Sequence, residues 1–291
     1  MGTRTRSPWC QTASGRSMLG HFSLSTQPRE PPGGKLDIEL PKYKRPDQPE
    51  HYRLSAARLW LPKRQFPTTP AHFWFRTCYV STIAAELSQL LPHILKLRIR
   101  PSTVASLVKF CVGLLPAFAA SWIQVILPEW FLPSHVVLKQ QKETGEAMIN
   151  EEQFGTEVKA YSRLKSLQGA VIPTFYGRSR YNGTRAMILE YLGGVSLSSP
   201  EGATLRLEEL SALLQPCYRA LHALGVHHDD PNLANFQLVN GNIMVMDLES
   251  AVFDMSADDL EYFMRTNIWD LAYRYRHMQA YYLYEGSLEA A

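Results

Sequence analysis

The chain has 291 residues, of which 45% are hydrophobic and 20% are charged, and its formal net charge is +3. This composition is ordinary for a globular protein and supplies enough apolar side chains for a core. The small charge, without a dominant basic cluster, gives no support for a nucleic-acid-binding protein. The four cysteines are far apart and form no C-x-x-C pair, which argues against zinc or a disulfide framework and favours a cytoplasmic location.

Residues 1–50 are rich in proline, glycine, serine and charge, and we interpret them as a disordered tail. The run Pro31-Pro32-Gly33-Gly34 fits neither a helix interior nor a central strand. The first thirty residues lack the continuous apolar run of a signal peptide. Their arginines, serines and threonines are also compatible with a mitochondrial presequence.

The next segment, up to residue 130, carries weaker signals. We expect a first strand within Tyr52–Leu61 and a helix within Leu87–Ile99. Thr103–Leu127 is the most apolar stretch, and its length matches the about 20 residues that span a bilayer. Lys109 and Pro116 interrupt it, so we favour a buried helix pair over a membrane span, because charge at bilayer depth is costly.

The pattern becomes clearer from residue 135 onward. Val136–Leu138 is a β-branched run that predicts a buried strand, and Asn150 is a candidate N-cap for a following helix. Two further strands, Val171–Tyr176 and Ala186–Leu192, are predicted on either side of a turn at Asn182-Gly183.

The last third predicts a long helix, a hairpin and a second helix. The apolar spacing over Leu207–Leu224 is that of an amphipathic helix. Asn240-Gly241 predicts a tight turn between the strands Phe236–Val239 and Ile243–Met246, because both turn positions tolerate positive φ. An aromatic-rich helix follows Ser256.

Three polar residues between and after these elements suggest phosphoryl transfer. Asp230 follows the long helix, Asn235 comes five residues later, and Asp247 follows the hairpin. Phosphoryl transfer requires a carboxylate that orients the attacking hydroxyl, oxygen ligands for Mg²⁺ and a cation on the phosphates. We therefore predict Asp230 as the catalytic base and Asn235 and Asp247 as metal ligands. Taken singly, each of these residues also suits an ordinary turn.

At this point the chain resembles the protein-kinase-like superfamily, in particular compact branches such as aminoglycoside and choline phosphotransferases and fungal kinase-like proteins. His228, Asp230 and Asn235 match the H-x-D pattern with asparagine five residues after the aspartate, and Asp247 matches the metal-binding aspartate. The resemblance implies an α+β, two-lobed protein-kinase-like fold. Its small antiparallel-sheet N-lobe would cover residues 51–192, poorly matched over 51–130, and its shortened helical C-lobe residues 193–291.

The resemblance also assigns roles upstream. Lys139 ends a predicted strand and would anchor the phosphates of ATP, while the backbone of Glu190 and Leu192 would bind adenine. Glu157 shares a helix face with apolar residues, and a buried charge needs a partner, so we expect an ion pair between Glu157 and Lys139. ATP and Mg²⁺ are the implied cofactors.

The sequence departs from the family pattern in several places. No G-x-G-x-x-G precedes Lys139, Asp229 stands where protein kinases have arginine, and Leu248-Glu249 replaces Phe-Gly. No A-P-E motif occurs after Asp247, which disfavours regulated phosphorylation of proteins. Two functions remain open: an ATP- and Mg²⁺-dependent phosphotransferase with an unknown acceptor hydroxyl, or a catalytically impaired pseudokinase that acts as a nucleotide-binding or scaffold module.

Overall fold

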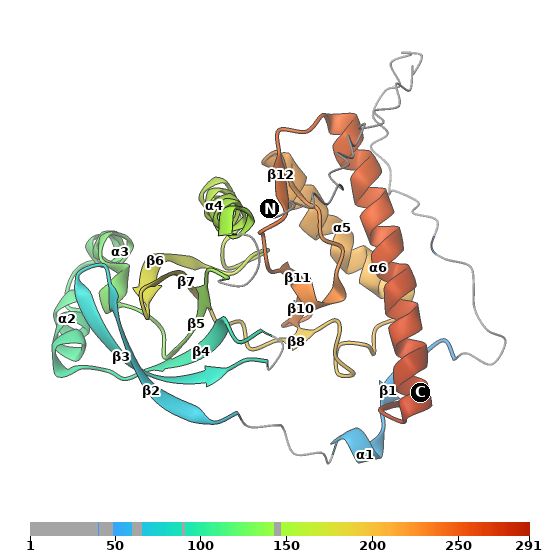
Figure 1. Cartoon of the computed structure of the whole chain (residues 1–291), viewed down its shortest axis with the longest axis horizontal. Helices are drawn as coiled ribbons and strands as arrows, with labels where there is room; N and C mark the ends of the chain where they lie inside the picture. The colour runs from blue at the N-terminus through green and yellow to red at the C-terminus, as the bar shows by residue number, and fades with distance from the viewer. Residues whose placement is uncertain (1–39, 41–48, 60–65, 89–90, 143–146) are drawn as a thin grey trace, which may run out of the picture. The chain divides into compact units, whose positions relative to one another are not determined.

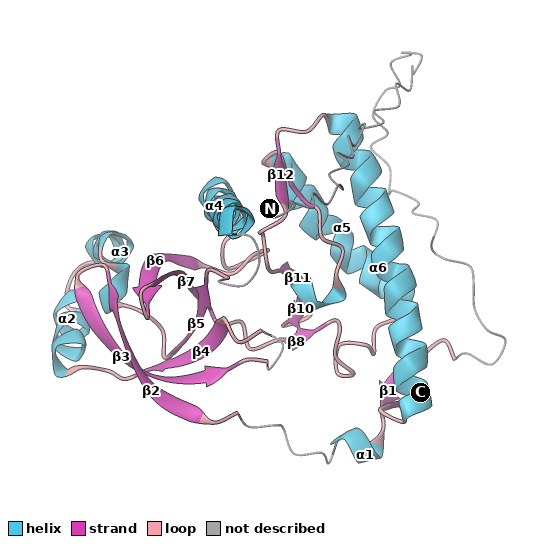
Figure 2. Cartoon of the chain, viewed as in Figure 1, coloured by secondary structure: helices cyan, strands magenta, loops and turns pink. Residues whose placement is uncertain are grey.

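The computed structural model describes residues 40, 49–59, 66–88, 91–142 and 147–291 (Figure 1). The predicted tail therefore lies outside the described residues, apart from Leu40, Pro49 and Glu50. The described elements comprise a β-barrel within residues 68–190 and a mainly helical part within residues 195–290 (Figure 2).

Six antiparallel strands close into the barrel in the order β2-β3-β4-β5-β7-β6. Closure occurs where Trp74 of β2 pairs with Arg180 of β6. Side chains alternate along each strand, so every second residue, such as Phe73 and Phe75, enters the apolar interior. The strands are β2 (Thr68–Phe75), β3 (Cys78–Glu86), β4 (Ile94–Ile99), β5 (His135–Gln140), β6 (Phe175–Tyr181) and β7 (Thr184–Glu190).

The barrel corrects the fold class predicted from the sequence. We expected a two-lobed protein-kinase-like fold whose N-lobe is a small antiparallel sheet, but pairing of β2 with β6 closes the sheet on itself. A closed barrel is not the typical sheet of a kinase N-lobe, so that fold class is wrong, although the chain is mixed α+β. Closure depends on strand pairs that are distant in sequence, and local periodicity carries no information about them.

The helix predicted over Leu87–Ile99 is also wrong. Its second half forms β4, which pairs with β3 on one side and β5 on the other. Leu97 is fully buried in the barrel, while the neighbouring Arg98 is exposed. This alternation has the period of a half-buried strand, and the charged residues between the leucines would have broken the apolar face of a helix.

The apolar stretch Thr103–Leu127 forms the predicted helix pair, α2 (Thr103–Gly113) and α3 (Ala117–Ile126), broken at Pro116. The expected burial of this pair is wrong, because Val112 is the one buried residue of α2 and α3 has none. Across the described ranges, no helix combines the length and apolarity needed to cross a membrane. The short helix η1 (Pro128–Trp130) leads from α3 towards β5.

Helix α4 (Ala147–Arg163) connects β5 to the rest of the barrel, followed by η2 (Lys165–Leu167). It begins before Asn150, so the predicted N-cap is wrong, and Asn150 is instead a buried residue of the first turn. The buried face of α4 also carries Glu157 and Tyr161, and the Tyr161 ring stacks on Phe175 of β6. This face directs Glu157 towards the interior beside β5.

The two Asn-Gly turns predicted from the sequence are confirmed. Asn182 and Gly183 have φ values of 50° and 84° and join β6 to β7. Asn240 and Gly241 have φ values of 50° and 81° and join β10 (Phe236–Val239) to β11 (Asn242–Val245). In both turns the residues adopt the left-handed conformation that asparagine tolerates and glycine adopts freely.

The helical part contains both predicted long helices, α5 (Leu207–Ala223) and α6 (Ala257–Glu285), which pack against each other (Figures 1 and 2). Ser256 caps α6, because its side chain accepts a hydrogen bond from the Asp259 amide. Short elements around the two helices are β8 (Val195–Ser196), β9 (Val226–His228), η3 (Leu233–Asn235) and β12 (Ala251–Phe253).

The predicted strand within Tyr52–Leu61 is shorter than expected. β1 (Tyr52–Leu54) pairs with β13 (Leu288–Ala290) beside the end of α6, and the short helix α1 (Ala56–Leu59) follows. The pairing attaches the beginning of the described chain to its C-terminal end rather than to the barrel.

Candidate functional site

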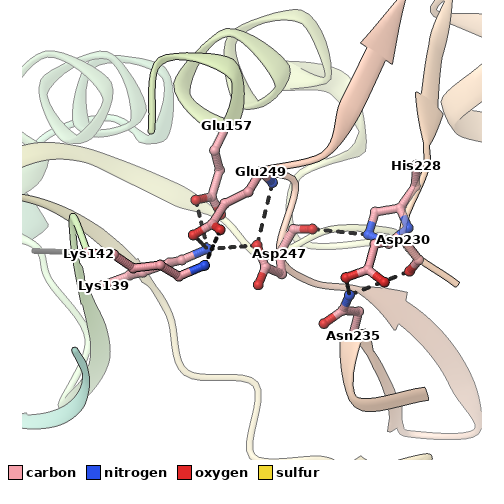
Figure 3. Close-up of polar contacts among 8 residues, drawn as sticks. All are labelled: Lys139, Lys142, Glu157, His228, Asp230, Asn235, Asp247 and Glu249. Carbon is pink, nitrogen blue, oxygen red and sulfur yellow. Dashed lines mark hydrogen bonds and ion pairs between the residues drawn. The ribbon is translucent and has the colours of Figure 1, made fainter. Parts of the chain in front are cut away.

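Lys139, in β5, lies at the centre of an ionic cluster built from three segments (Figure 3). Its Nζ atom is 2.8 Å from Oε2 of Glu157, 2.9 Å from Oδ1 of Asp247 and 2.9 Å from Oε1 of Glu249. The ion pair with Glu157 that we predicted from the sequence is therefore present. Lys142 also pairs with Glu249.

The charged groups of this cluster shift one another's pKa values strongly, because the cluster is largely buried and water screens its charges little. Burial alone would lower the pKa of Lys139, but the three surrounding carboxylates outweigh it and hold the pKa above the usual range. Burial raises the pKa of Asp247, but Lys139 outweighs this effect, and the net pKa lies below the usual value. Burial raises the pKa of Glu157 to about 7, against the opposing influence of Lys139. Lys139 therefore stays positively charged and stabilises the ionised form of Asp247.

The second part of the site is the segment around Asp230. Nδ2 of Asn235 donates a hydrogen bond of 2.8 Å to Oδ2 of Asp230, so the two predicted residues are in direct contact. The amide oxygen of Asn235 points away from Asp230 (Figure 3). Asn232 stabilises the intervening loop, because its side chain accepts from the Ala234 amide. The loop therefore presents a half-buried carboxylate and leaves the oxygen of Asn235 for another contact.

His228 connects the two parts of the site. Its Nε2 atom lies 3.0 Å from the backbone oxygen of Asp247. A carbonyl oxygen can only accept, so Nε2 carries the hydrogen, and burial lowers the pKa of His228, which keeps the ring neutral. Figure 3 shows Asp247 between the Lys139 cluster and His228. The bond ties the end of β9 to the loop after β11.

Asp247 has an unusual backbone conformation. Its φ of 55° is in the left-handed region, which costs energy for a residue with a Cβ atom, although aspartate tolerates it better than most. The neighbouring Met246 amide donates to the Asn235 backbone oxygen at 2.7 Å, and Nε2 of His228 donates to the Asp247 backbone oxygen. These bonds fix a strained residue so that its carboxylate faces Lys139, an arrangement common at functional sites.

Helix α6 supports the site from behind. Nδ2 of Asn267 donates to the backbone oxygen of His228 at 3.1 Å. Nε2 of His222 and Nδ1 of His227 lie 3.0 Å apart in the same buried layer.

Sequence reasoning missed Asn267 and Lys142. Nothing near either residue in the sequence signals its role, because their partners lie in distant segments.

The two residues predicted to bind adenine differ in their availability. The Glu190 amide donates to the Thr174 oxygen at 2.9 Å, and the Glu190 carboxylate accepts from the Thr174 amide and hydroxyl. The Glu190 amide is thus already used. Leu192 lies beyond the end of β7, and no hydrogen bond to its backbone is found within the described part of the chain.

Three carboxylates beside Lys139 form a further group of oxygen atoms that could hold a cation. Atoms of Glu157, Asp247 and Glu249 lie within 4.8 Å of one another, whereas we predicted Asn235 and Asp247. Carboxylate and amide oxygens suit Mg²⁺, so the donor chemistry on both sides of Asp247 fits this ion. Glu249, which the sequence presented only as a departure from Phe-Gly, becomes an additional candidate ligand.

The arrangement combines a fixed cation, a group of carboxylates and a separate half-buried carboxylate that is held by an amide. Three carboxylates already contact the Lys139 ammonium, so an anionic ligand would have to displace one of them, while the Asp230 carboxylate can accept a hydrogen bond from a hydroxyl group. Comparison of the sequence with protein-family models found no match, and comparison with curated proteins found none either.

Proposed function

We propose that the chain is an ATP- and Mg²⁺-dependent phosphotransferase that acts on an alcohol group of an acceptor. The proposal rests on the chemistry of the site and not on the fold, since one fold hosts many functions and one chemistry recurs on different folds. Kinship with the protein-kinase-like superfamily is part of the proposal. It rests on the order of matching residues along the chain, which are Lys139, Glu157, His228, Asp230, Asn235 and Asp247.

The observation that carries the proposal is the bond between His228 and the Asp247 backbone, which joins the Lys139 cluster to the loop containing Asp230. In this assignment Lys139 holds the phosphates, and Glu157 orients Lys139. Asp247 would hold Mg²⁺ together with Glu249 or Asn235, and the bound ion would neutralise charge on the phosphates. Asp230 orients the acceptor hydroxyl and takes its proton, while the amide of Asn235 keeps the carboxylate in place.

The test is Mg²⁺-dependent ATP hydrolysis or transfer by the purified chain, comparing Asp230→Asn with Asp229→Asn. Both substitutions remove one carboxylate from the same loop, but Asp229 is exposed and lies outside the contact with Asn235. Loss of a general base lowers turnover by about a hundredfold or more. We expect that loss for Asp230→Asn and nearly full activity for Asp229→Asn. Equal activity of the wild type and Asp230→Asn would contradict the role given to Asp230.

A second function, a nucleotide-binding module without turnover, is favoured by one observation. Glu249 is the third carboxylate in contact with Lys139, and it also pairs with Lys142. Carboxylates therefore already surround the ammonium group that would bind the phosphates. The cavity bordered by Lys139, Lys142 and Glu249 has a volume of only about 10 Å³, roughly the room for one water molecule. Nucleotide binding would have to displace Glu249 or enter from the Asp247 side.

Thermal unfolding with ATP, in the presence and absence of Mg²⁺, distinguishes the two functions. A ligand at 100 times its Kd stabilises the folded state by about 2.7 kcal/mol. A Mg²⁺-dependent shift together with turnover supports the phosphotransferase, and a shift without turnover supports the binding module. No shift with any nucleotide would contradict both.

A further inference from the structure

The helix pair α2–α3 presents an apolar surface that no described part of the chain covers. Leu107, Phe110 and Leu114 recur at helical spacing on α2, and Phe118, Trp122 and Val125 do so on α3. The exposed fractions of these six side chains are Leu107 62%, Phe110 65%, Leu114 73%, Phe118 72%, Trp122 71% and Val125 71%. We define these residues as the hairpin surface. Monomeric proteins rarely expose so many large apolar residues together.

The composition of α3 is unusually apolar for a helix that is exposed to water. The helix Ala117–Ile126 has no charged residue, and its inward side carries Ala119, Ala120 and Ile123. Ser121 and Gln124 are its only polar residues, and a helix with so little polar surface normally lies inside a protein or in lipid. The turn between the two helices is apolar as well, because Leu114, Leu115 and Pro116 are all exposed. The hairpin surface therefore continues across the tip of the pair.

The charged residues of the segment that contains the hairpin surface are basic up to Glu129. The sequence between Glu86 and Glu129 contains no acidic residue but four basic ones, which are Lys96, Arg98, Arg100 and Lys109. Glu129 itself is buried and bonded to Thr77 and Arg76. Arg100 and Lys109 line, together with Glu129, a cavity of about 430 Å³ between α2 and β3, where Nζ of Lys109 donates to the Leu132 backbone oxygen at 3.3 Å. The small net charge of the whole chain conceals this local excess of cations.

We propose that the hairpin surface binds an anionic lipid bilayer, with its leucines and aromatic rings among the acyl chains and its cations at the headgroups. Short apolar helices with aromatic residues on one side and basic residues beside them lie in the interface of such bilayers. Charge complementarity favours lipid over a second copy of the chain. A symmetric dimer would bring the Arg100 and Lys109 side chains of both copies to one interface without a carboxylate of this segment between them. The attachment is interfacial and places neither helix across the membrane.

Flotation of the full chain with vesicles tests the proposal. We would compare phosphatidylcholine alone with phosphatidylcholine mixed with phosphatidylserine, each at low and high salt. We expect binding to the mixed vesicles that weakens with salt, because screening reduces the attraction of the cations. Phe118→Gln/Trp122→Gln should reduce partitioning by about tenfold or more. Arg100→Gln and Lys109→Gln should each reduce it by about fivefold.

Tyr281→Gln/Tyr284→Gln is the matched control, since both tyrosines are exposed on α6 and lie outside the hairpin surface. It should leave partitioning unchanged, and both double variants should keep the wild-type melting temperature because the replaced side chains are exposed. Absence of vesicle binding, or binding unaffected by Phe118→Gln/Trp122→Gln, would overturn the proposal. Equal binding to both lipid compositions would overturn the role of the cations. A concentration-dependent dimer that the double variant abolishes, without vesicle binding, would assign the surface to a second copy.

Discussion

Nζ of Lys139 and Oε2 of Glu157 lie 2.8 Å apart, and their side chains are only 5% and 1% exposed. The pair links a barrel strand to helix α4, and two further carboxylates, those of Asp247 and Glu249, share the same ammonium group. The two partners are therefore not equivalent. Among the described residues Glu157 pairs with one cation, whereas Lys139 contacts three carboxylates.

This asymmetry predicts different costs for removing each partner. Lys139→Met leaves a group of buried carboxylates with Lys142 alone and should destabilise the fold by about 3–5 kcal/mol. Glu157→Gln keeps the shape and leaves Lys139 with two carboxylates, so we expect a cost of about 1–3 kcal/mol. Urea unfolding measures both values. A larger cost for Glu157→Gln than for Lys139→Met would contradict the assigned asymmetry.

The control for this comparison is the ion pair between Arg185 and Glu151, whose side chains are 51% and 63% exposed. Exposed pairs contribute less than about 1 kcal/mol, because water screens the charges. Arg185→Met should therefore change the free energy of unfolding far less than Lys139→Met does.

The pair His222–His227 predicts a loss of stability in mild acid. One ring must donate and the other accept across 3.0 Å, so the accepting ring must be neutral and the two rings cannot both be protonated. Burial, with a contribution from His227, lowers the pKa of His222 to about 4, and burial also lowers the pKa of His227. The unfolded chain then binds more protons than the folded chain below pH about 6.5. Stability should be full above that pH and fall progressively towards pH about 4.

Melting temperatures measured from neutral pH down to pH about 5 test this dependence. His222→Gln retains a donor for His227 but cannot be protonated, so the decline should become shallower. His277→Gln, at an exposed position on α6, should leave the decline as in the wild type. An unchanged slope in His222→Gln would show that the acid sensitivity arises elsewhere.

Two glycines predict opposite effects of adding a methyl group. A Cβ atom on Gly194 would lie 2.5 Å from the Leu238 oxygen and 2.6 Å from Cγ2 of Val239. Gly194→Ala should therefore destabilise the fold by about 1–3 kcal/mol. Gly155 is an exposed residue of α4 with no atom within 4 Å of the same position, so Gly155→Ala should stabilise by about 0.5–1 kcal/mol. Denaturant midpoints of the two variants should shift in opposite directions.

Tyr275 predicts how strongly α6 is held to the loop before α5. Its buried hydroxyl donates to the Gly202 oxygen at 2.7 Å and accepts from the Leu205 amide at 3.0 Å. Tyr275→Phe leaves both backbone groups without this partner and should cost about 1–3 kcal/mol. Tyr284, 92% exposed near the end of the same helix, provides the control, and Tyr284→Phe should change stability by less than about 0.5 kcal/mol. Similar unfolding curves for the two variants would contradict the bonding role.

Features that depend on residues close together in the chain could be predicted from the sequence alone. Local spacing and backbone preference predicted the Asn-Gly turns at 182–183 and 240–241 and the helices after residues 206 and 256. The ion pair between Lys139 and Glu157 was also predictable, because a carboxylate on an apolar helix face requires a cation.

Features that join distant segments became visible in the folded chain and could not be predicted from local patterns. Closure of the barrel depends on the pairing of residues 74 and 180, and Lys142 meets Glu249 across 107 positions. The exposure of α2–α3 was equally hidden, since an apolar pattern indicates that a surface avoids water but not what covers it. Periodicity describes one element at a time, whereas strand partners, ionic clusters and uncovered faces depend on how separate elements pack together.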